Sequence, residues 1–414
     1  MSGHLTHRLF RVIPNLQRSV TTQSKQQHFR TLLLGTNIVY KSKYLHLNHP
    51  KQYDVDKYAE LNNRLAAVPY LDLLETGLKS VRDDLTYEND LRLEDALKWC
   101  AKVFDYNVKN GKKIRGIALL KAYCSYAFNM DDDTWNKWDS NGWTSAVILA
   151  WCVELLQAYF IVLDDIMDQS ILRRGELCWY KKPDVGLCAI NDGLLLQCGV
   201  YKLLEKHFAG SECYNNVLHE FLQITHKTVY GQCLDMLFNP INQKPRYEKF
   251  TFDNYQTLVE YKTSNYTFGL PVHLAMHLVG GSSAEDFNFT RKLCFKLGLY
   301  FQSQDDYLDC FGNSKITGKF GNDIREGKCT WFSAKFLEEA SETDKKQFLD
   351  NYGNEDKESI AKVLQLYKSS SMLEKFEQFD ELLHSEIVSL INSMDSIKGG
   401  LFYNLFSQLR KREK

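Results

Sequence analysis

Proline is scarce in this chain, with seven among 414 residues. Because proline interrupts helices, its scarcity favours long helical segments. Segments that alternate apolar and polar residues, as half-buried strands do, are nearly absent. No internal repeat or low-complexity tract is visible, and the net charge of −1 gives no general attraction to nucleic acid. These absences predict an all-α protein that does not bind nucleic acid.

Long apolar runs are also missing. A membrane-spanning helix needs about 20 consecutive apolar residues. The longest runs here are interrupted by Glu154, Gln157 or Asp164. We therefore expect no stable membrane span.

Paired cysteines are absent too, because the 11 cysteines form no C-x-x-C motif. Most lie on apolar faces of expected helices, as Cys152, Cys198 and Cys233 do. This pattern predicts reduced thiols buried in a helical core, rather than disulfides or a metal site.

Acidic residues are missing from the first 53 positions. Eight of the 51 Lys and Arg residues lie there, with frequent Ser and Thr, but none of the 52 Asp and Glu residues does. This composition is typical of a mitochondrial transit peptide; a disordered basic leader on a cytoplasmic protein is the alternative. The remaining 43 basic and 52 acidic residues leave positions 54–414 with a net charge near −9, so an anion must be bound by local cations.

From about Val68 onward, amphipathic segments of helical length alternate with short polar breaks. The clearest are WTSAVILAWCVELLQAYFIVL, NVLHEFLQITHKTVYGQCLDMLF and FTRKLCFKLGLYFQSQDDYLDCFG. We expect residues 54–414 to form a single all-α domain.

Two aspartate clusters with D-D-x-x-D spacing end two of these apolar segments: Asp164, Asp165 and Asp168, and Asp305, Asp306 and Asp309. Carboxylates on an apolar helix need a partner, and Mg²⁺ prefers oxygen ligands and bridges to phosphates. If the two helices face each other, the clusters would bind several Mg²⁺ ions and, through them, a diphosphate leaving group. The alternative is that these carboxylates cap helix ends at the surface.

Basic residues accompany both clusters and could bind the same diphosphate: Arg173, Arg174, Lys262, Lys319 and Lys328. A second anion site is indicated by NGKKIRG, where Lys112 and Arg115 lie in a loop that enters a helix. Backbone N–H groups and the helix dipole favour an anion at such a position.

Two aromatic residues precede the first cluster on the same helix. Tyr159 and Phe160 lie five and four residues before Asp164, which places them about 6 to 8 Å deeper at 1.5 Å per residue. Rings at this depth would close the floor of a cavity and limit the length of a growing chain; the alternative is that they are ordinary core aromatics.

The motifs YNVKNGKKIRG, VLDDIMDQSILRRG, GQCLDML, YKT, QSQDDYLDCFG and TGKFGNDIREGKCTW resemble, in this order, the signature motifs of the trans-prenyl diphosphate synthases. The similarity runs from about residue 70 to the end, and it is nearest to the eukaryotic, insect-like members that make farnesyl diphosphate.

The resemblance implies an isoprenoid-synthase-type antiparallel helical bundle with a central active-site cavity, assembled as a homodimer. It also implies a Mg²⁺-dependent prenyltransferase, with three Mg²⁺ ions per site and Mn²⁺ as a substitute. The family reaction condenses isopentenyl diphosphate with an allylic diphosphate, dimethylallyl or geranyl, to give farnesyl diphosphate. It proceeds by ionisation of the allylic diphosphate, condensation and elimination of a proton.

Residue roles follow from the same resemblance. Metal ligands are expected among both aspartate clusters. The allylic diphosphate would be bound by Arg173, Lys262, Lys319 and Lys328. Isopentenyl diphosphate would be bound by Lys112, Arg115, Gln157 and Arg174. Thr263 and Gln302 match residues near the allylic carbocation, and aromatic residues at Tyr159 and Phe160 accompany a fifteen-carbon product.

Departures from the family pattern concentrate on the isopentenyl side. Asn110 replaces a usual glycine, Ile114 a usual asparagine and Ser303 an aliphatic residue, and Glu413 interrupts the basic C-terminal tail. They leave open a terpene synthase of prenyl-synthase ancestry, which ionises farnesyl diphosphate alone and releases a bisabolane-type sesquiterpene. A non-catalytic subunit of a heteromeric synthase is a third alternative.

Overall fold

The protein is described by a computed structural model that covers residues 65–127, 140–240, 243–312 and 322–410. The predicted leader, residues 1–53, lies outside these ranges, so its role stays a prediction. Within the described ranges the only strands are β1 (Leu172–Arg173) and β2 (Glu176–Leu177), which pair in an antiparallel hairpin. The prediction of an all-α fold is therefore confirmed.

Helices make up the rest of the regular structure. The first half contains α4 (Tyr70–Leu85), η2 (Leu91–Leu93), α5 (Glu94–Asn107), α6 (Ile114–Ala127), α8 (Ser140–Met167), η3 (Trp179–Lys181), η4 (Gly186–Cys188), α9 (Ala189–Phe208) and α10 (Tyr214–Phe238). The second half contains η5 (Tyr247–Lys249), α11 (Phe252–Val259), η6 (Glu260–Gly269), α12 (Leu270–Val279), α13 (Ala284–Phe311), α15 (Asp323–Glu326), α16 (Trp331–Glu339), α17 (Glu342–Asn351), α18 (Lys357–Ser369), α19 (Met372–Asn392) and α20 (Ser396–Arg410).

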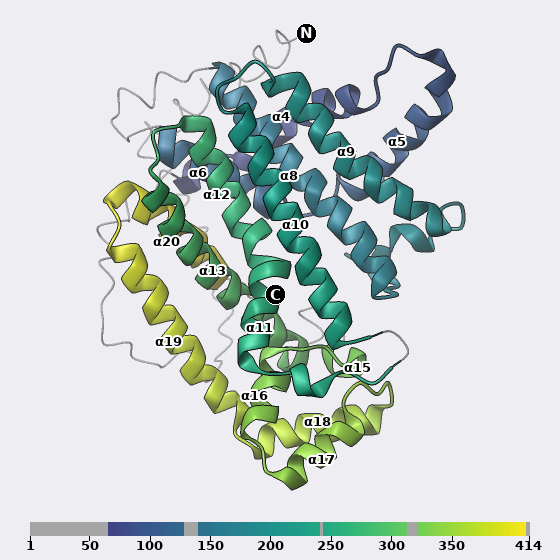
Figure 1. Ribbon diagram of the computed structural model, residues 1–414, viewed down its shortest axis with the longest axis vertical. Coiled ribbons are helices and arrows are strands. Elements are labelled where there is room, and N and C mark those ends of the chain that lie inside the picture. Colours follow the sequence, from purple (N-terminus) through teal and green to yellow (C-terminus); the bar gives the residue numbers. More distant parts are fainter. Residues whose placement is uncertain (1–64, 128–139, 241–242, 313–321, 411–414) are drawn as a thin grey trace, which may run out of the picture.

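The long helices form a bundle, with α10 running through the centre of the view and the short helices α16 to α18 gathered at its lower end (Figure 1). Within this bundle α8 packs against α4, α6, α9 and α12. Every residue of α8 from Ala146 to Tyr159 is buried, as expected for a helix that is apolar on all sides. Its C-terminal end therefore has a fixed position relative to four neighbouring helices.

Two segments, Gly142–Met167 and Gly186–Phe208, are long and apolar enough to cross a membrane by length and composition alone. The expectation that polar interruptions make every run too short is therefore wrong. The most apolar window of the first segment is 83% buried inside the protein, so the core accounts for its hydropathy.

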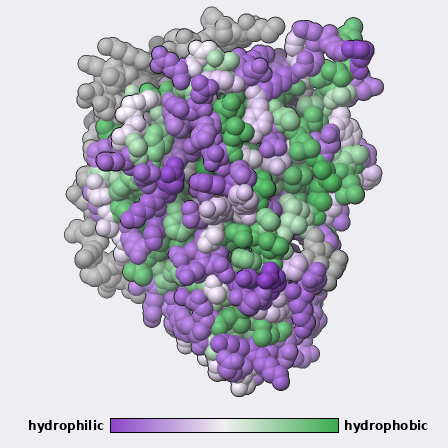
Figure 2. Space-filling model, in the orientation of Figure 1, coloured by the Kyte–Doolittle hydropathy of each residue, from purple (hydrophilic) through white to green (hydrophobic). Residues whose placement is uncertain are grey.

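An apolar outer face extends over η4, α9 and α10. Its members are exposed large side chains: Leu187, Ile190, Leu194, Leu222, Val229, Tyr230 and Leu237. Figure 2 shows apolar side chains gathered across this face of the molecule.

All 11 cysteines are free and Cys152 is buried, as predicted. Cys198 and Cys233, however, are exposed, because the apolar faces that carry them point outward rather than into the core.

The segment η6 is a π-helix that continues α11 and leads into α12. Its wide turns are stabilised by Ser264 and Asn265, whose side chains donate to the carbonyls of Val259 and Glu260, five residues earlier. Pro271 follows and has no N–H to continue the helical ladder. Insertions of this kind are frequent at functional sites, and this one carries Lys262 and Thr263.

Close packing fixes η6 against α10. A Cβ added at Gly231 of α10 would lie 2.3 Å from the backbone nitrogen of Lys262. Only glycine permits this approach, so the backbones of α10 and η6 are in direct contact at Gly231 and Lys262.

Candidate active site

The last turns of α8 carry the first aspartate cluster, where the buried helix reaches the solvent. Asp165 is buried and accepts a hydrogen bond of 2.9 Å from Nε of Arg173. The carboxylate of Asp164 lies 3.5 Å from the same guanidinium group. The β1–β2 hairpin therefore turns Arg173 back onto the cluster that precedes it in sequence.

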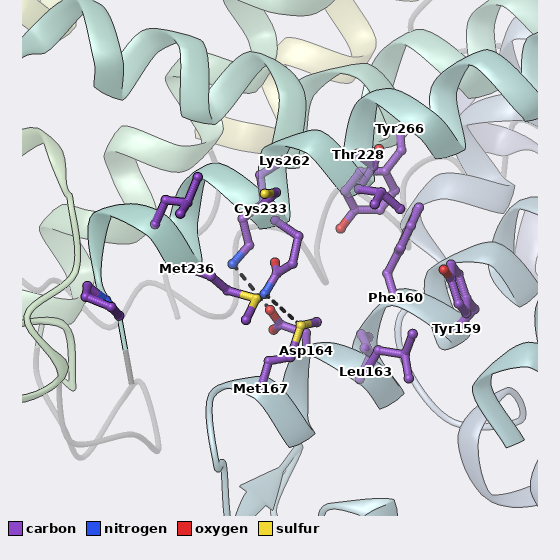
Figure 3. A pocket seen from close by; sticks show the side chains of 15 residues that line it. Tyr159, Phe160, Leu163, Asp164, Met167, Thr228, Cys233, Met236, Lys262 and Tyr266 are labelled. Carbon is purple, nitrogen blue, oxygen red and sulfur yellow. Dashed lines mark hydrogen bonds and ion pairs between the residues drawn. The ribbon is translucent and has the colours of Figure 1, made fainter. Parts of the chain in front are cut away.

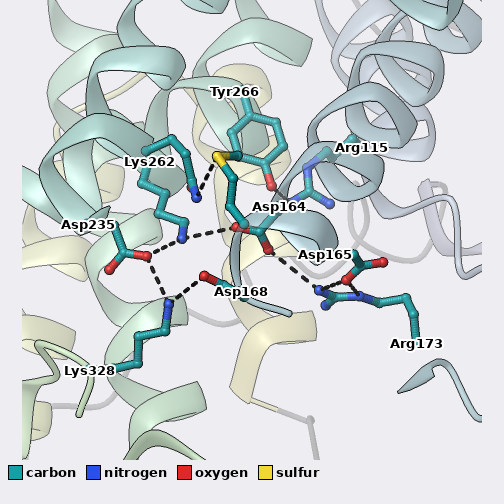
Figure 4. A network of polar contacts seen from close by, with 11 residues as sticks. Arg115, Asp164, Asp165, Asp168, Arg173, Asp235, Lys262, Tyr266 and Lys328 are labelled. Carbon is teal, nitrogen blue, oxygen red and sulfur yellow. Dashed lines mark hydrogen bonds and ion pairs between the residues drawn. The ribbon is translucent and has the colours of Figure 1, made fainter. Parts of the chain in front are cut away.

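Two lysines from distant segments complete a charge network with this cluster (Figure 4). Nζ of Lys262, from η6, lies 3.3 Å from Asp164 and 2.6 Å from Asp235. Nζ of Lys328, which precedes α16, lies 2.9 Å from Asp168 and 3.1 Å from Asp235. The structure thus brings together two of the cations and two of the carboxylates predicted from sequence.

Asp235 is the member of this network that sequence reasoning missed. It lies in the quoted motif GQCLDML, on α10, and is buried. A single aspartate among apolar residues was the available signal, because such a group needs a partner. It joins both lysines and so fixes the distance between them.

The network shifts the ionisation of its members. Burial raises the pKa of Asp235, but Lys262 and Lys328 outweigh it and hold the pKa well below its ordinary value. Asp168 behaves differently: burial and the neighbouring Asp164 charge raise its pKa. Burial lowers the pKa values of Lys262 and Lys328, but the carboxylates, Asp235 first, raise both above the ordinary value. Both lysines are therefore cationic at neutral pH and able to bind a diphosphate.

The second aspartate cluster lies near the end of α13, and its members have different surroundings. Asp306 is buried and accepts from the Tyr255 hydroxyl at 2.8 Å, the Trp331 backbone N–H at 2.9 Å and the Gln302 amide at 3.0 Å. Asp306 thus satisfies the first N–H of α16 and holds Gln302. Asp306, predicted as a metal ligand, thus accepts the first N–H of a neighbouring helix as a capping carboxylate does, but it does so in the core rather than at the surface.

Asp309 accepts the backbone N–H groups of Asn322 and Asp323, at 3.1 and 2.9 Å, where α15 begins. Asp305 is partly exposed on the same helix. Gln302 connects this cluster to η6, because its Oε1 accepts from the Thr263 hydroxyl at 3.2 Å. The predicted pair Thr263 and Gln302 is therefore in contact.

A divalent cation fits the first cluster. Among the described residues, no three His, Cys, Asp or Glu side chains are grouped closely enough to hold a metal by themselves. Mg²⁺, however, commonly takes one or two carboxylates and completes its shell with water and substrate phosphates. Oδ1 of Asp164 is buried and makes no hydrogen bond to a described group; its ion-pair contact is the ammonium group of Lys262 at 3.3 Å, so a lone pair of this oxygen suits a metal ligand.

The predicted isopentenyl residues lie around the start of α6. The guanidinium of Arg115 donates to the hydroxyls of Tyr266 and Thr267, both at 2.8 Å, and stacks over the Tyr266 ring. Lys112 is exposed. Oε1 of Gln157, on α8, is buried and has no hydrogen-bond partner among the described residues. Nε of Arg115 is likewise buried and has no hydrogen-bond partner among the described residues.

Arg174 reaches the same loop from the hairpin. Its Nη1 donates to the carbonyl of Asn110 at 2.6 Å. A Cβ at Gly111, whose φ is +111°, would lie 2.4 Å from that guanidinium, so glycine is required there. Asn110, which replaces a usual glycine, does not have a positive φ, whereas Gly111 and Lys113 do.

A cavity of about 600 Å³ opens beside the charge network. Its walls come mainly from α8, α10 and η6 and are mostly apolar; Asp164 and Lys262 are the charged residues that line it. Figure 3 shows Tyr159 and Phe160 on one side of Asp164. The ring of Phe160 packs 5.0 Å from Tyr159 and 5.3 Å from Tyr266. The two aromatics predicted to limit chain length therefore line the same cavity as Asp164 and Lys262.

Two predicted features lie outside the described residues: Lys319, and Glu413 with the rest of the basic tail. Ser303, the third departure from the family pattern, is fully buried and donates to the Tyr300 carbonyl. It lies inside the helix packing and contacts no predicted substrate ligand.

Comparison with known proteins gives consistent matches. Residues 97–370 match the family model described as Polyprenyl synthetase. The farnesyl pyrophosphate synthase of Gallus gallus is 38% identical over 77% of this chain and 86% of its own length. That of Saccharomyces cerevisiae is 37% identical over 74% and 86%.

Solved structures agree. The farnesyl diphosphate synthase of T. Brucei in complex with homorisedronate BPH-6 is 29% identical and superposes with a TM-score of 0.75. The match covers 83% of this chain and 99% of the T. Brucei chain. The structure of the same T. Brucei enzyme without a named ligand gives a TM-score of 0.73. The expected isoprenoid-synthase fold is thereby confirmed.

Proposed function

The chain belongs to the polyprenyl synthetase family and is a prenyltransferase, and we propose that it condenses isopentenyl diphosphate with dimethylallyl or geranyl diphosphate to give farnesyl diphosphate. The observation that carries this proposal is the cavity. Its mainly apolar walls carry the charged pair Asp164 and Lys262 and, to one side of that pair, the rings of Tyr159 and Phe160. A molecule with a diphosphate head and a short isoprenoid tail has this distribution of polarity.

The diphosphate of the allylic substrate is bound by Lys262, Lys328 and Arg173. In the absence of substrate these cations are paired with the carboxylates of α8 and with Asp235. Asp164, Asp168 and Asp305 would hold Mg²⁺, which would supply the positive charge that stabilises the diphosphate as a leaving group. The lysines then exchange part of their carboxylate contacts for phosphate oxygens.

Ionisation breaks the bond between the allylic carbon and the diphosphate oxygen, and the electron pair leaves with the diphosphate. The double bond of isopentenyl diphosphate attacks the cation to form the new carbon–carbon bond. A proton then leaves the adjacent carbon and passes to the departing diphosphate. The hydroxyl of Thr263, oriented by Gln302, stabilises the cation with its oxygen, and the apolar walls exclude water.

The terpene synthase alternative finds no support in the comparisons, whose matches are farnesyl pyrophosphate synthases. Arg115 and Gln157, which such an enzyme would not need, both have polar atoms without a described hydrogen-bond partner. Chain elongation is therefore the function that we propose.

The test is a pair of incubations of the full chain with Mg²⁺. One contains isopentenyl and geranyl diphosphates, and the other contains farnesyl diphosphate alone. We expect farnesyl diphosphate from the first and no reaction in the second. A volatile terpene from the second, with no elongation in the first, would reject the proposal in favour of a terpene synthase.

We also propose a homodimer and mitochondrial import. The apolar outer face of α9 and α10 is the surface best suited to a second copy, since such faces rarely remain uncovered. Light scattering tests the dimer, and a Leu194→Glu variant should shift the protein to a monomer.

Fusion of residues 1–53 to a fluorescent protein tests mitochondrial import; a diffuse cytoplasmic signal would contradict import.

A further inference from the structure

Lys112 and Lys113 are neighbours with opposite surroundings. Lys112, the predicted substrate ligand, is exposed, whereas Lys113 is only 6% exposed. The φ of +50° at Lys113 turns its side chain away from the solvent and back beneath the loop. A non-glycine residue with this backbone is uncommon and is retained where its surroundings require it.

The ammonium group of Lys113 joins the two helices that flank the loop. Its Nζ donates to the carbonyl of Val108, at the C-terminal end of α5, and to that of Asn110 at 2.8 Å. A cation is favourable beside the free carbonyls of a helix C-terminus. The carbonyl of Lys113 accepts from the N–H of Ile117 at 2.9 Å and so begins α6.

The same loop is where Arg174 arrives. The Asn110 carbonyl accepts from both Lys113, at 2.8 Å, and Arg174, at 2.6 Å. Two cationic donors would repel each other without a nearby anion, and Glu154 of α8 supplies that charge while accepting the Gly116 N–H at 2.8 Å. The loop is thus held from below by Lys113 and from the side by Arg174.

We propose that Lys113 is a positioning residue that fixes the loop bearing Lys112, and through the shared Asn110 carbonyl the side chain of Arg174, so that both bind isopentenyl diphosphate. This inference rests on the proposed function. Lys113 does not touch the substrate; it sets the geometry of the two cations that do. Loss of its ammonium group frees the end of α5 from the start of α6, and weakens the binding of isopentenyl diphosphate without affecting the allylic diphosphate.

The test compares Lys113→Met, Lys113→Arg and a matched control, Lys121→Met. Lys121 is a buried lysine too, but it lies within α6 and donates to Asn404 at 2.8 Å, away from the loop. For each full-length variant, KM for isopentenyl and for geranyl diphosphate is measured, with amide hydrogen exchange across residues 108–116.

Lys113→Met removes both hydrogen bonds of the ammonium group, and we expect KM for isopentenyl diphosphate to rise about tenfold, at the low end of the effect of losing a hydrogen bond to a charged group. KM for geranyl diphosphate stays within about twofold, exchange in the loop accelerates, and Lys113→Arg restores most of the affinity. An equal rise for both substrates, or the same rise in Lys121→Met, would overturn the proposal. If wild-type protein shows no elongation, the proposed function fails, and unchanged exchange in Lys113→Met would separately refute the anchoring role.

Discussion

The carboxylate of Asp235 lies 2.6 Å from the ammonium group of Lys262, across the interface between α10 and η6. This contact forms where Gly231 lets the two backbones meet. It supplies a counter-charge to a lysine that would otherwise lie beside the cavity with only Asp164 of α8 as its partner. The position of Lys262 is therefore fixed before any substrate binds.

Replacement of Asp235 by Asn tests this dependence. Two cations then lose a buried partner, and we expect the free energy of unfolding to fall by about 3 kcal/mol. We also expect KM for the allylic diphosphate to rise more than KM for isopentenyl diphosphate, because Lys262 and Lys328 lose their common anchor. Denaturant unfolding and steady-state kinetics measure the two effects. Equal changes in the two KM values would contradict the expectation that Asp235 anchors Lys262 and Lys328 for the allylic diphosphate.

The aspartate clusters should be indispensable for turnover. For Asp164→Ala and Asp305→Ala we expect kcat to fall by about a thousandfold, or about 4 kcal/mol of lost transition-state stabilisation, with the fold retained. Asp95→Ala, on the exposed face of α5, serves as the control and should retain activity. Near-normal turnover in either cluster variant would reject the assignment of metal ligands.

The aromatic floor predicts product length. Phe160→Ala removes a ring from the cavity wall, and we expect products longer than fifteen carbons in chromatographic analysis. Phe208→Ala, which removes a buried ring of α9 outside the cavity, controls for destabilisation of about 3 kcal/mol, the usual cost of this change. An unchanged product from Phe160→Ala would mean that the ring is an ordinary part of the core.

Lys121 gives the fold a pH dependence of known sign. Burial lowers the pKa of Lys121 from 10.5 to about 8. Between these values the unfolded chain keeps a proton that the folded chain has released, so stability rises with pH. Relative to Lys121→Met, wild-type protein should therefore gain up to about 3 kcal/mol between roughly pH 8 and pH 10.5. Chemical denaturation at both ends of this range measures the gain, and a constant difference would contradict the prediction.

Hydrophobic periodicity predicted the helical fold, and motif spacing predicted most residues of the candidate site. Periodicity and spacing are both read from residues that are close in sequence. Asp164 and Asp168 are four residues apart on one helix, so they share a helix face whatever the tertiary fold. Asp235 could not be assigned from sequence, since its two lysines lie 27 and 93 residues away.

The second cluster shows the same limit. Asp305 and Asp306 are adjacent, and a helix separates their directions by about 100°. Which of them faces the core is decided by Tyr255 and by the start of α16, contacts that only the tertiary fold provides. In the same way, nothing in the letters KK indicates which lysine is buried.

The burial of α8 has a consequence for the synthesis of the protein on the ribosome. This helix passes the length and hydropathy test for a membrane span, but α9 and α12, which cover it, are synthesised later. Until they emerge from the ribosome, the nascent chain exposes an apolar segment that chaperones bind and that favours aggregation. The apolar helix that helps to form the cavity wall is thus also a segment at risk of misfolding during translation.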